Sequence, residues 1–164
     1  MKYLNEIRTL EELKKNYHKW AIRLHPDNGG SLEEMKVLNE EYAQVFKKVK
    51  NIHLNKDGKE YTKETNEKPE EFRNLINELL KLNNILIEVI GCFVWVSGET
   101  RPYRDKLKSL GMKWHSKKKR WYFSPEGYKR YGGGEYSMED IRNMYGVEFS
   151  EEVNKKEIQT AEAI

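Results

Sequence analysis

Two helix-start signals on either side of one helix-stop signal constrain the first fifty residues of this chain to a pair of helices. Each start signal is a capping box, in which a hydroxyl and a carboxylate three residues apart satisfy the free amides of a helix start. The two boxes are Thr9 with Glu12 and Ser31 with Glu34. Pro26 lies between them, and a residue that precedes proline is disfavoured in the helical conformation. The sequence Asn-Gly-Gly at 28–30 then supplies a tight turn.

Both predicted helices carry apolar residues at the three- and four-residue spacing that places them on one helix face. The first stripe consists of Leu10, Leu13, Tyr17, Ala21 and Leu24. The second consists of Met35, Leu38, Tyr42, Val45, Phe46 and Val49. Two such helices joined by a short turn pack as an antiparallel hairpin.

The turn opens with His25, Pro26 and Asp27, a tripeptide that resembles the signature of the J-domain family, the co-chaperones typified by DnaJ. In that family the tripeptide lies between two antiparallel helices, as the periodicity predicts here. The resemblance covers residues 1–50 and is to J-domains with a short turn, such as those of viral and organellar proteins. It implies a co-chaperone that docks on a DnaK-type ATPase and stimulates ATP hydrolysis by that partner. The chain itself is therefore not expected to be an enzyme.

The chemistry of the tripeptide suits such docking. Pro26 makes a rigid kink, and Asp27 offers a carboxylate that an arginine of a partner can bind through paired hydrogen bonds. His25 adds a donor and an acceptor. The expected docking surface also includes the cationic side chains of the first helix, which are Lys14, Lys15, His18, Lys19 and Arg23. A plain polar turn beside solvated lysines is the alternative interpretation.

Neither a catalytic nor a metal site is expected at this turn. No nucleophile or metal ligand lies near His25 in the sequence, and His18 is seven residues away from it, about two helical turns. The single cysteine, Cys92, excludes an internal disulfide and a cluster of thiolate ligands. We accordingly predict no cofactor and a reducing, cytoplasmic location, and no run of residues is apolar enough for a membrane span.

The remainder of the chain divides by composition. Residues 51–68 carry few apolar groups and predict a polar linker. Residues 69–83 predict an amphipathic connecting helix whose stripe is Phe72, Leu75, Ile76, Leu79 and Leu82. Its packing partner is left open. Residues 84–146 predict a small α/β module of order β-β-α-β-β followed by short helical segments, and residues 147–164 a frayed acidic tail. The fold class is α+β, with two small units expected.

The module is basic, because residues 84–146 contain 12 lysines and arginines against 7 acidic residues. Its second predicted hairpin combines aromatic and cationic side chains, which can stack on bases and neutralise phosphates. They are Trp114, Lys117, Lys118, Lys119, Arg120, Trp121 and Tyr122. This stretch loosely resembles Trp- and Lys-rich modules of phage and mobile-element proteins. It predicts a surface for nucleic acid or for a protein client. The alternative interpretation is purely structural, with the aromatic residues in the core of the small sheet and the lysines keeping the hairpin tip soluble.

Two functions from different classes follow. The first is a co-chaperone whose module directs it to a client or a nucleic-acid complex. The second is a small protein that binds single-stranded nucleic acid, in which the helical hairpin is only a scaffold.

Overall fold

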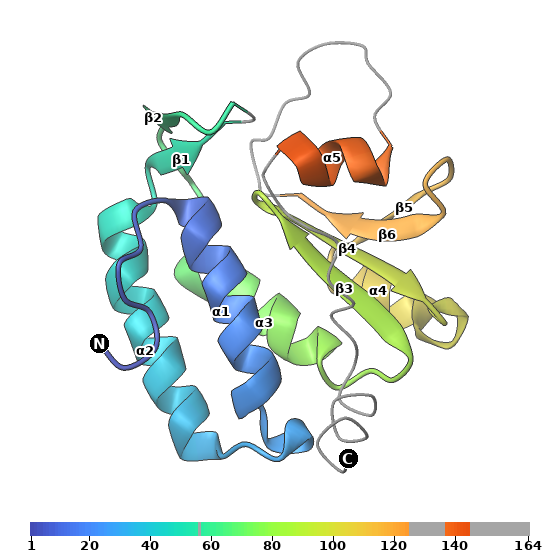
Figure 1. The fold of residues 1–164 in the computed structure, drawn as a ribbon. Helices are drawn as coiled ribbons and strands as arrows, with labels where there is room; N and C mark the ends of the chain where they lie inside the picture. Colours follow the sequence, from blue (N-terminus) through green and yellow to red (C-terminus); the bar gives the residue numbers. More distant parts are fainter. Residues whose placement is uncertain (56, 125–136, 145–164) are drawn as a thin grey trace.

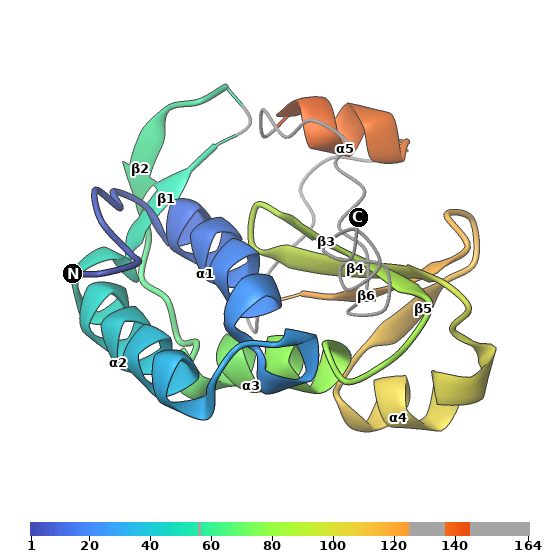
Figure 2. The ribbon, with the colours of Figure 1, turned by 60° about the horizontal axis from the view of Figure 1, so that its bottom comes forward.

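A computed structural model of the protein describes residues 1–55, 57–124 and 137–144. Helices of the N-terminal half pack on one face of a small antiparallel sheet, and a last helix lies on the other face (Figures 1 and 2). The predicted α+β class is confirmed. No helix within the described ranges is both long enough and apolar enough to cross a bilayer.

The N-terminal hairpin consists of α1 (Leu10–Leu24), the short 3-10 helix η1 (Pro26–Asn28) and α2 (Leu32–Val49). Both predicted helix starts are present, because Thr9 Oγ1 accepts from the Glu12 amide at 3.2 Å and Ser31 Oγ from the Glu34 amide at 3.1 Å. All side chains of the two predicted apolar stripes are buried. Local sequence signals therefore determine this hairpin.

Residues 51–68, predicted to be a linker, contain the short strands β1 (Ile52–Leu54) and β2 (Glu60–Thr62). They pair as an antiparallel hairpin in which His53 faces Tyr61. Strands of only three residues are too short to show a period, so the sequence pattern could not reveal them. A contact from α1 holds the hairpin, because Glu11 Oε2 accepts from the Leu54 amide at 2.9 Å.

Helix α3 (Pro69–Leu79) is shorter than the predicted 69–83, and its whole predicted apolar stripe is buried. It packs against both α1 and α2, and its apolar side chains belong to the same core as those of the sheet. The ring of Phe72 lies 5.9 Å from that of Tyr17 in α1. The helix thus joins the hairpin to the sheet.

The sheet comprises β3 (Ile85–Ile90), β4 (Phe93–Gly98), β5 (Lys113–His115) and β6 (Arg120–Phe123), in the order β3-β4-β6-β5. All neighbouring strands are antiparallel. The 3-10 helix η2 (Arg101–Tyr103) and α4 (Arg104–Ser109) connect β4 to β5, which confirms the predicted β-β-α-β-β order. The predicted two-residue turn at residues 91–92 is also present, since Ile90 pairs with Phe93.

Alternation along the strands separates two apolar faces. Side chains such as Ile87, Val94 and Trp121 belong to the main core with the helices. Ile90 and Trp95 instead pack with Met138 of α5 (Met138–Met144) on the opposite face. Ion pairs hold α5 there as well. Arg142 donates from Nε to Glu88 Oε1 at 2.7 Å and from Nη2 to Glu88 Oε2 at 3.0 Å.

One continuous core extends from Leu4 in the N-terminal segment to Trp121 in β6. The predicted helical hairpin and the predicted α/β module therefore contribute side chains to the same core. A buried ion pair also crosses between the two parts, because Lys14 Nζ of α1 lies 2.7 Å from Glu67 Oε2 just before α3. The predicted acidic tail at 147–164, like the glycine run at 132–134, lies outside the described residues.

Candidate functional site

His25 is the internal anchor of the turn between α1 and α2. Its amide donates to the Ala21 carbonyl at 2.9 Å, and its own carbonyl accepts from the amides of Asn28 at 2.9 Å and Gly30 at 3.1 Å. The ring nitrogen Nδ1 accepts from the Asp27 amide at 3.2 Å. With 6% of its surface exposed, the residue holds the turn in shape and offers little surface to a partner.

The ring of His25 also lies near the side chain of Asp27, with Nδ1 3.9 Å from Oδ2. A nitrogen that accepts the Asp27 amide proton carries a lone pair and no proton of its own. While this hydrogen bond exists, the 3.9 Å between His25 Nδ1 and Asp27 Oδ2 is therefore not a contact between two charged groups. The backbone contact, which is shorter, determines the geometry here.

Asn28 and the two glycines complete the turn. The Asn28 side chain is buried and donates from Nδ2 to the Ile22 carbonyl at 2.7 Å, which satisfies one carbonyl of the last turn of α1. Gly29 has φ of +88°, and a Cβ at Gly30 would clash with the Leu24 carbonyl. The sequence pattern marked residues 28–30 as a turn but did not show that Asn28 is a buried capping residue.

Two members of the tripeptide face outward. Pro26 and Asp27 are exposed, and the Asp27 side chain retains 40% of its accessible surface. The exposed cations Lys15, Lys19 and Arg23 lie at four-residue intervals along α1, which places them in one row leading to this turn. We call these three residues the cationic ridge. The exposed carboxylate of Asp27 and the cationic ridge together form a charged surface at one end of the hairpin.

Lys14 and His18 are not part of that surface. The prediction that both side chains lie on the exposed face of α1 is wrong. They are buried, with 0% and 1% exposed. Lys14 Nζ pairs with Glu67 and lies 5.2 Å from the centre of the Phe72 ring. The reason is a long-range one: α3 and β3 also pack against α1. Helical periodicity cannot reveal a covering element from a distant part of the chain.

Only some members of the predicted basic aromatic surface on the β5–β6 hairpin are exposed. Trp114 and Trp121 face each other across the strands, with ring centres 5.7 Å apart. Trp114 is 49% exposed, whereas Trp121 is 5% exposed and belongs to the core. Arg120 donates from Nη1 to Glu88 at 3.3 Å. Trp121 is thus a core residue, and Arg120 contributes to the ion pairs on Glu88.

The other predicted members lie nearer to solvent. Lys117 and Lys119 are exposed at the hairpin tip, whereas Lys118 is half-buried. Tyr122 is half-buried, and its ring centre lies 5.5 Å from that of Trp95. The exposed part of this predicted surface therefore consists of Trp114 and the two tip lysines, Lys117 and Lys119.

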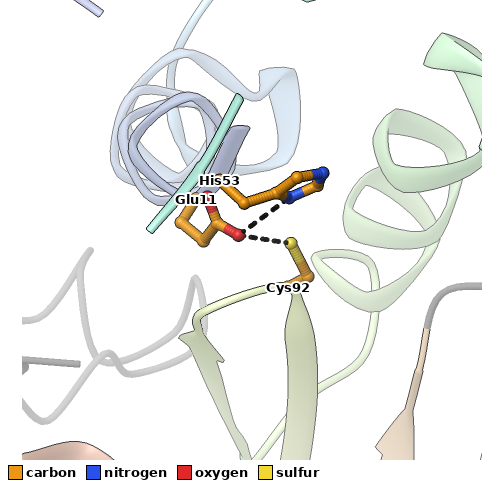
Figure 3. Close-up of side chains that lie close together, drawn as sticks. All are labelled: Glu11, His53 and Cys92. Carbon is orange, nitrogen blue, oxygen red and sulfur yellow. Dashed lines mark hydrogen bonds and ion pairs between the residues drawn. The ribbon is translucent and has the colours of Figure 1, made fainter. Parts of the chain in front are cut away.

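A third constellation was not predicted from the sequence. Glu11 of α1, His53 of β1 and Cys92 of the β3–β4 turn point toward one another (Figure 3). Glu11 Oε1 lies 3.1 Å from His53 Nδ1, and Cys92 Sγ donates to the same oxygen at 3.4 Å. The residues are far apart in sequence, because Glu11 is 42 positions from His53 and 81 positions from Cys92. No local motif could have identified them.

The surroundings of Cys92 keep its thiol protonated. Burial is the main cause, and the charges of Glu11 and Glu67 act in the same direction, against the opposing charge of Lys14. Together they raise the pKa of Cys92 to about 12. A cysteine nucleophile reacts as its thiolate, and a pKa raised this far does not favour that form near neutral pH.

Comparison of the chain with protein-family models, with curated proteins and with solved structures finds no match.

Proposed function

We propose that the protein is a J-domain co-chaperone that docks on a DnaK-type ATPase through the α1–α2 turn and stimulates its ATP hydrolysis. The observation that carries the proposal is the exposure of Pro26 and Asp27 on a turn held by buried contacts of His25 and Asn28. A carboxylate presented by a rigid turn loses little conformational freedom when a partner's arginine binds it.

The charge distribution beside the turn supports the same partner class. Lys15, Lys19 and Arg23 form a row of exposed cations, and Arg23 lies 5.7 Å from the ring centre of Trp20. Such a row attracts an acidic surface and orients it before contact. Because Lys14, His18 and His25 are buried, the proposed docking surface consists of Pro26, Asp27 and the cationic ridge. It is smaller than the surface expected from the sequence.

The decisive experiment is the ATP turnover of a DnaK-type chaperone with and without the full chain. We expect stimulation by the unaltered protein and its loss in Asp27→Asn. Removing one partner of a charge pair that becomes buried in a complex costs about 2 kcal/mol or more, which is roughly a 30-fold weaker complex. Glu33→Gln is the matched control, since it also removes one exposed carboxylate, in the first turn of α2. No stimulation by the unaltered protein would refute the proposal.

The ridge is tested by charge reversal. Changing Lys15, Lys19 and Arg23 to glutamate should slow docking and reduce its dependence on salt, because the cations act on the approach of the partner. Reversal of Lys47 and Lys48, exposed at the far end of α2, is the control. Equal effects of the two sets would show that only overall charge matters, and would argue against a specific surface.

The second candidate function is binding of single-stranded nucleic acid by the β5–β6 hairpin. Its specific support is Trp114, a 49% exposed aromatic ring on the edge strand β5, in the same hairpin as the exposed tip lysines Lys117 and Lys119. Stacking on such a ring contributes about 1–3 kcal/mol per base. Affinity for oligonucleotides that falls with salt, and falls again in Trp114→Ala, would favour it. Binding that does not depend on salt would indicate a protein client.

A further inference from the structure

We propose that Glu11, His53 and Cys92 bind a single Zn²⁺ ion and that this ion joins α1, the β1–β2 hairpin and the β3–β4 turn. The proposal goes beyond the docking function, because the cluster contains no residue of the tripeptide turn or of the cationic ridge. It depends on four properties of the cluster, namely ligand geometry, outer contacts, charge and donor chemistry.

The ligand atoms are already close to the spacing that zinc requires. Zinc binds N and O ligands at about 2.0–2.2 Å and S ligands at about 2.3 Å. In a tetrahedral arrangement, these bond lengths place the N ligand about 3.4 Å from the O ligand and the S ligand about 3.6 Å from it. The observed separations from Glu11 Oε1 are 3.1 Å to His53 Nδ1 and 3.4 Å to Cys92 Sγ. All three ligand atoms lie within 4.8 Å of one another. Small side-chain adjustments suffice to coordinate one ion.

Outer contacts hold two of the ligands in place. His53 Nε2 lies 3.1 Å from the Lys63 carbonyl and 3.0 Å from Thr65 Oγ1. A ring nitrogen that donates to a carbonyl leaves the other nitrogen with a lone pair for a metal, which is the usual support of a zinc-bound histidine. The second oxygen of Glu11 accepts from the Leu54 amide at 2.9 Å. These contacts orient Nδ1 and Oε1 toward the centre of the cluster.

The charges of the site balance when zinc is present. Glu11 is buried, and a buried carboxylate needs a compensating positive charge. Lys14 does not supply it, because its amine pairs with Glu67 at 2.7 Å. When zinc binds, the Cys92 thiol releases its proton to solvent, and the resulting thiolate and the carboxylate of Glu11 together neutralise the divalent cation. Without a metal, Nδ1 of His53 must carry a proton that it donates to the Glu11 oxygen. This protonated pair of His53 and Glu11 is the alternative that the experiment tests.

The donor set selects zinc among common divalent ions. One sulfur, one imidazole nitrogen and one carboxylate oxygen suit zinc, whereas magnesium and calcium prefer oxygen ligands alone. Three protein ligands leave a fourth position for water. Glu67 contributes a second buried carboxylate oxygen, Oε1, to which the described part of the chain gives no hydrogen bond. Its charge reaches the site, since it acts on the Cys92 thiol.

Metal binding to the full-length protein tests the proposal directly. Cobalt(II), which replaces zinc in such sites, should produce a sulfur-to-metal charge-transfer band in the near ultraviolet and should be displaced by zinc. Cys92 is the only cysteine in the chain, so this band can arise only from Cys92. Zinc titrated against a chromophoric chelator should bind with a stoichiometry of one per chain and should raise the midpoint of thermal unfolding.

The variants Cys92→Ser and His53→Gln distinguish zinc binding from the alternative, in which a protonated His53 pairs with Glu11. The serine keeps a hydrogen-bond donor toward Glu11 but removes the soft sulfur. Each change should weaken zinc binding by more than the roughly 10–100-fold that loss of an outer contact costs. The matched control is His115→Gln, which alters a half-buried histidine on β5. The absence of the cobalt band in the unaltered protein, or equal zinc affinity of Cys92→Ser, would overturn the proposal. Asp27→Asn should bind zinc normally.

Discussion

Gly29 and Gly30 are neighbours in the sequence, but the turn depends on them for different reasons. Gly29 has φ of +88° and open space where a Cβ would lie. Gly30 has no unusual φ, but a Cβ there would clash with the Leu24 carbonyl at the end of α1. The first position therefore restricts only the backbone conformation. The second restricts how closely two backbone segments approach.

We therefore expect unequal effects of the two alanine substitutions. Gly29→Ala should lower the free energy of unfolding by about 1–2 kcal/mol, the cost of a left-handed L-residue. Gly30→Ala should cost more than about 3 kcal/mol, because a backbone carbonyl cannot move aside without breaking the end of α1. Urea unfolding of both variants measures the difference. A smaller loss for Gly30→Ala than for Gly29→Ala would contradict the geometry of the turn.

Tyr17 couples stability to high pH. Its hydroxyl donates to Asn39 Oδ1 at 2.6 Å and accepts from Asn77 Nδ2 at 3.0 Å, and its ring is fully buried. Burial raises its pKa from 10.0 to about 12, against the opposing effects of Asn77 and Arg73. Below the unfolded pKa the tyrosine is neutral in both states, so its contribution is then fully present. Between the two values the unfolded chain ionises first, which favours unfolding.

The free energy of unfolding should therefore fall by about 2 kcal/mol between pH 10 and pH 12 from Tyr17 alone. Tyr17→Phe should be less stable at neutral pH, because two hydrogen bonds are lost, but its stability should decline less steeply above pH 10. Some decline should remain in that variant, because burial also raises the pKa of Tyr42. Chemical unfolding at a series of pH values measures both slopes. Equal slopes would exclude the proposed role of Tyr17.

The burial of residues covered by the next helix in the sequence was predictable from the sequence. Both stripes of the hairpin are buried as their spacing predicted, because 3.6-residue periodicity records the face that another helix covers. The burial of Lys14 was not predictable in this way. Its partner Glu67 lies 53 positions away, and the covering elements α3 and β3 come much later in the chain than α1. Glu11 and His18 were missed for the same reason.

At the scale of elements, length decided what could be recognised. The six-residue strands β3 and β4 carry enough alternating β-branched residues to be read from the sequence, and both are present. The three-residue strands β1 and β2 contain too few positions for a period. Their hairpin depends on contacts to α1, such as the bond from the Leu54 amide to Glu11. Tertiary contacts of this kind are not visible in a local pattern.

Helix α5 depends on one side chain for much of its attachment. Arg142 makes two hydrogen bonds to Glu88 of β3, at 2.7 Å and 3.0 Å, beside the small apolar cluster of Met138, Ile90 and Trp95. Arg142→Met should weaken docking of α5 by about 1.5–3 kcal/mol, the usual contribution of a hydrogen bond to a charged group. Loss of amide-exchange protection in residues 138–144, and a shifted Trp95 indole resonance, would measure it.

Glu139→Gln is the control for that experiment, because it changes an exposed charge on the same helix. It should leave both the exchange rates and the Trp95 resonance unchanged. If Arg142→Met also leaves them unchanged, the apolar cluster alone holds α5 and the ion pairs contribute nothing measurable.

Within the part of the chain that the structure describes, the N-terminal helices and the sheet share one large core, where composition suggested a separate core for each. The charged fraction of 35% predicted small units joined by a polar segment, because a chain of this composition has few apolar residues for a large core. The available apolar residues are instead shared, since α3 contacts the hairpin helices and its side chains join the core of the sheet. Composition limits the amount of apolar surface but does not determine how elements share it.

A shared core predicts a single unfolding transition. Far-ultraviolet circular dichroism follows mainly the helices, and tryptophan fluorescence in Trp20→Phe follows Trp95, Trp114 and Trp121, which all lie in the sheet. The urea midpoints from the two signals should coincide. Separate midpoints would mean that the hairpin and the sheet unfold independently, contrary to the continuous core.

The buried pair of Lys14 and Glu67 has a consequence for how this protein can evolve. Both side chains are almost completely enclosed, at 0% and 1% exposed. Loss of either member alone strands a charge inside the fold, at a cost of about 3–5 kcal/mol, whereas replacing both with apolar residues is close to neutral. Descendants of this sequence should therefore keep both residues or exchange them together. Positions 14 and 67 should covary across such descendants.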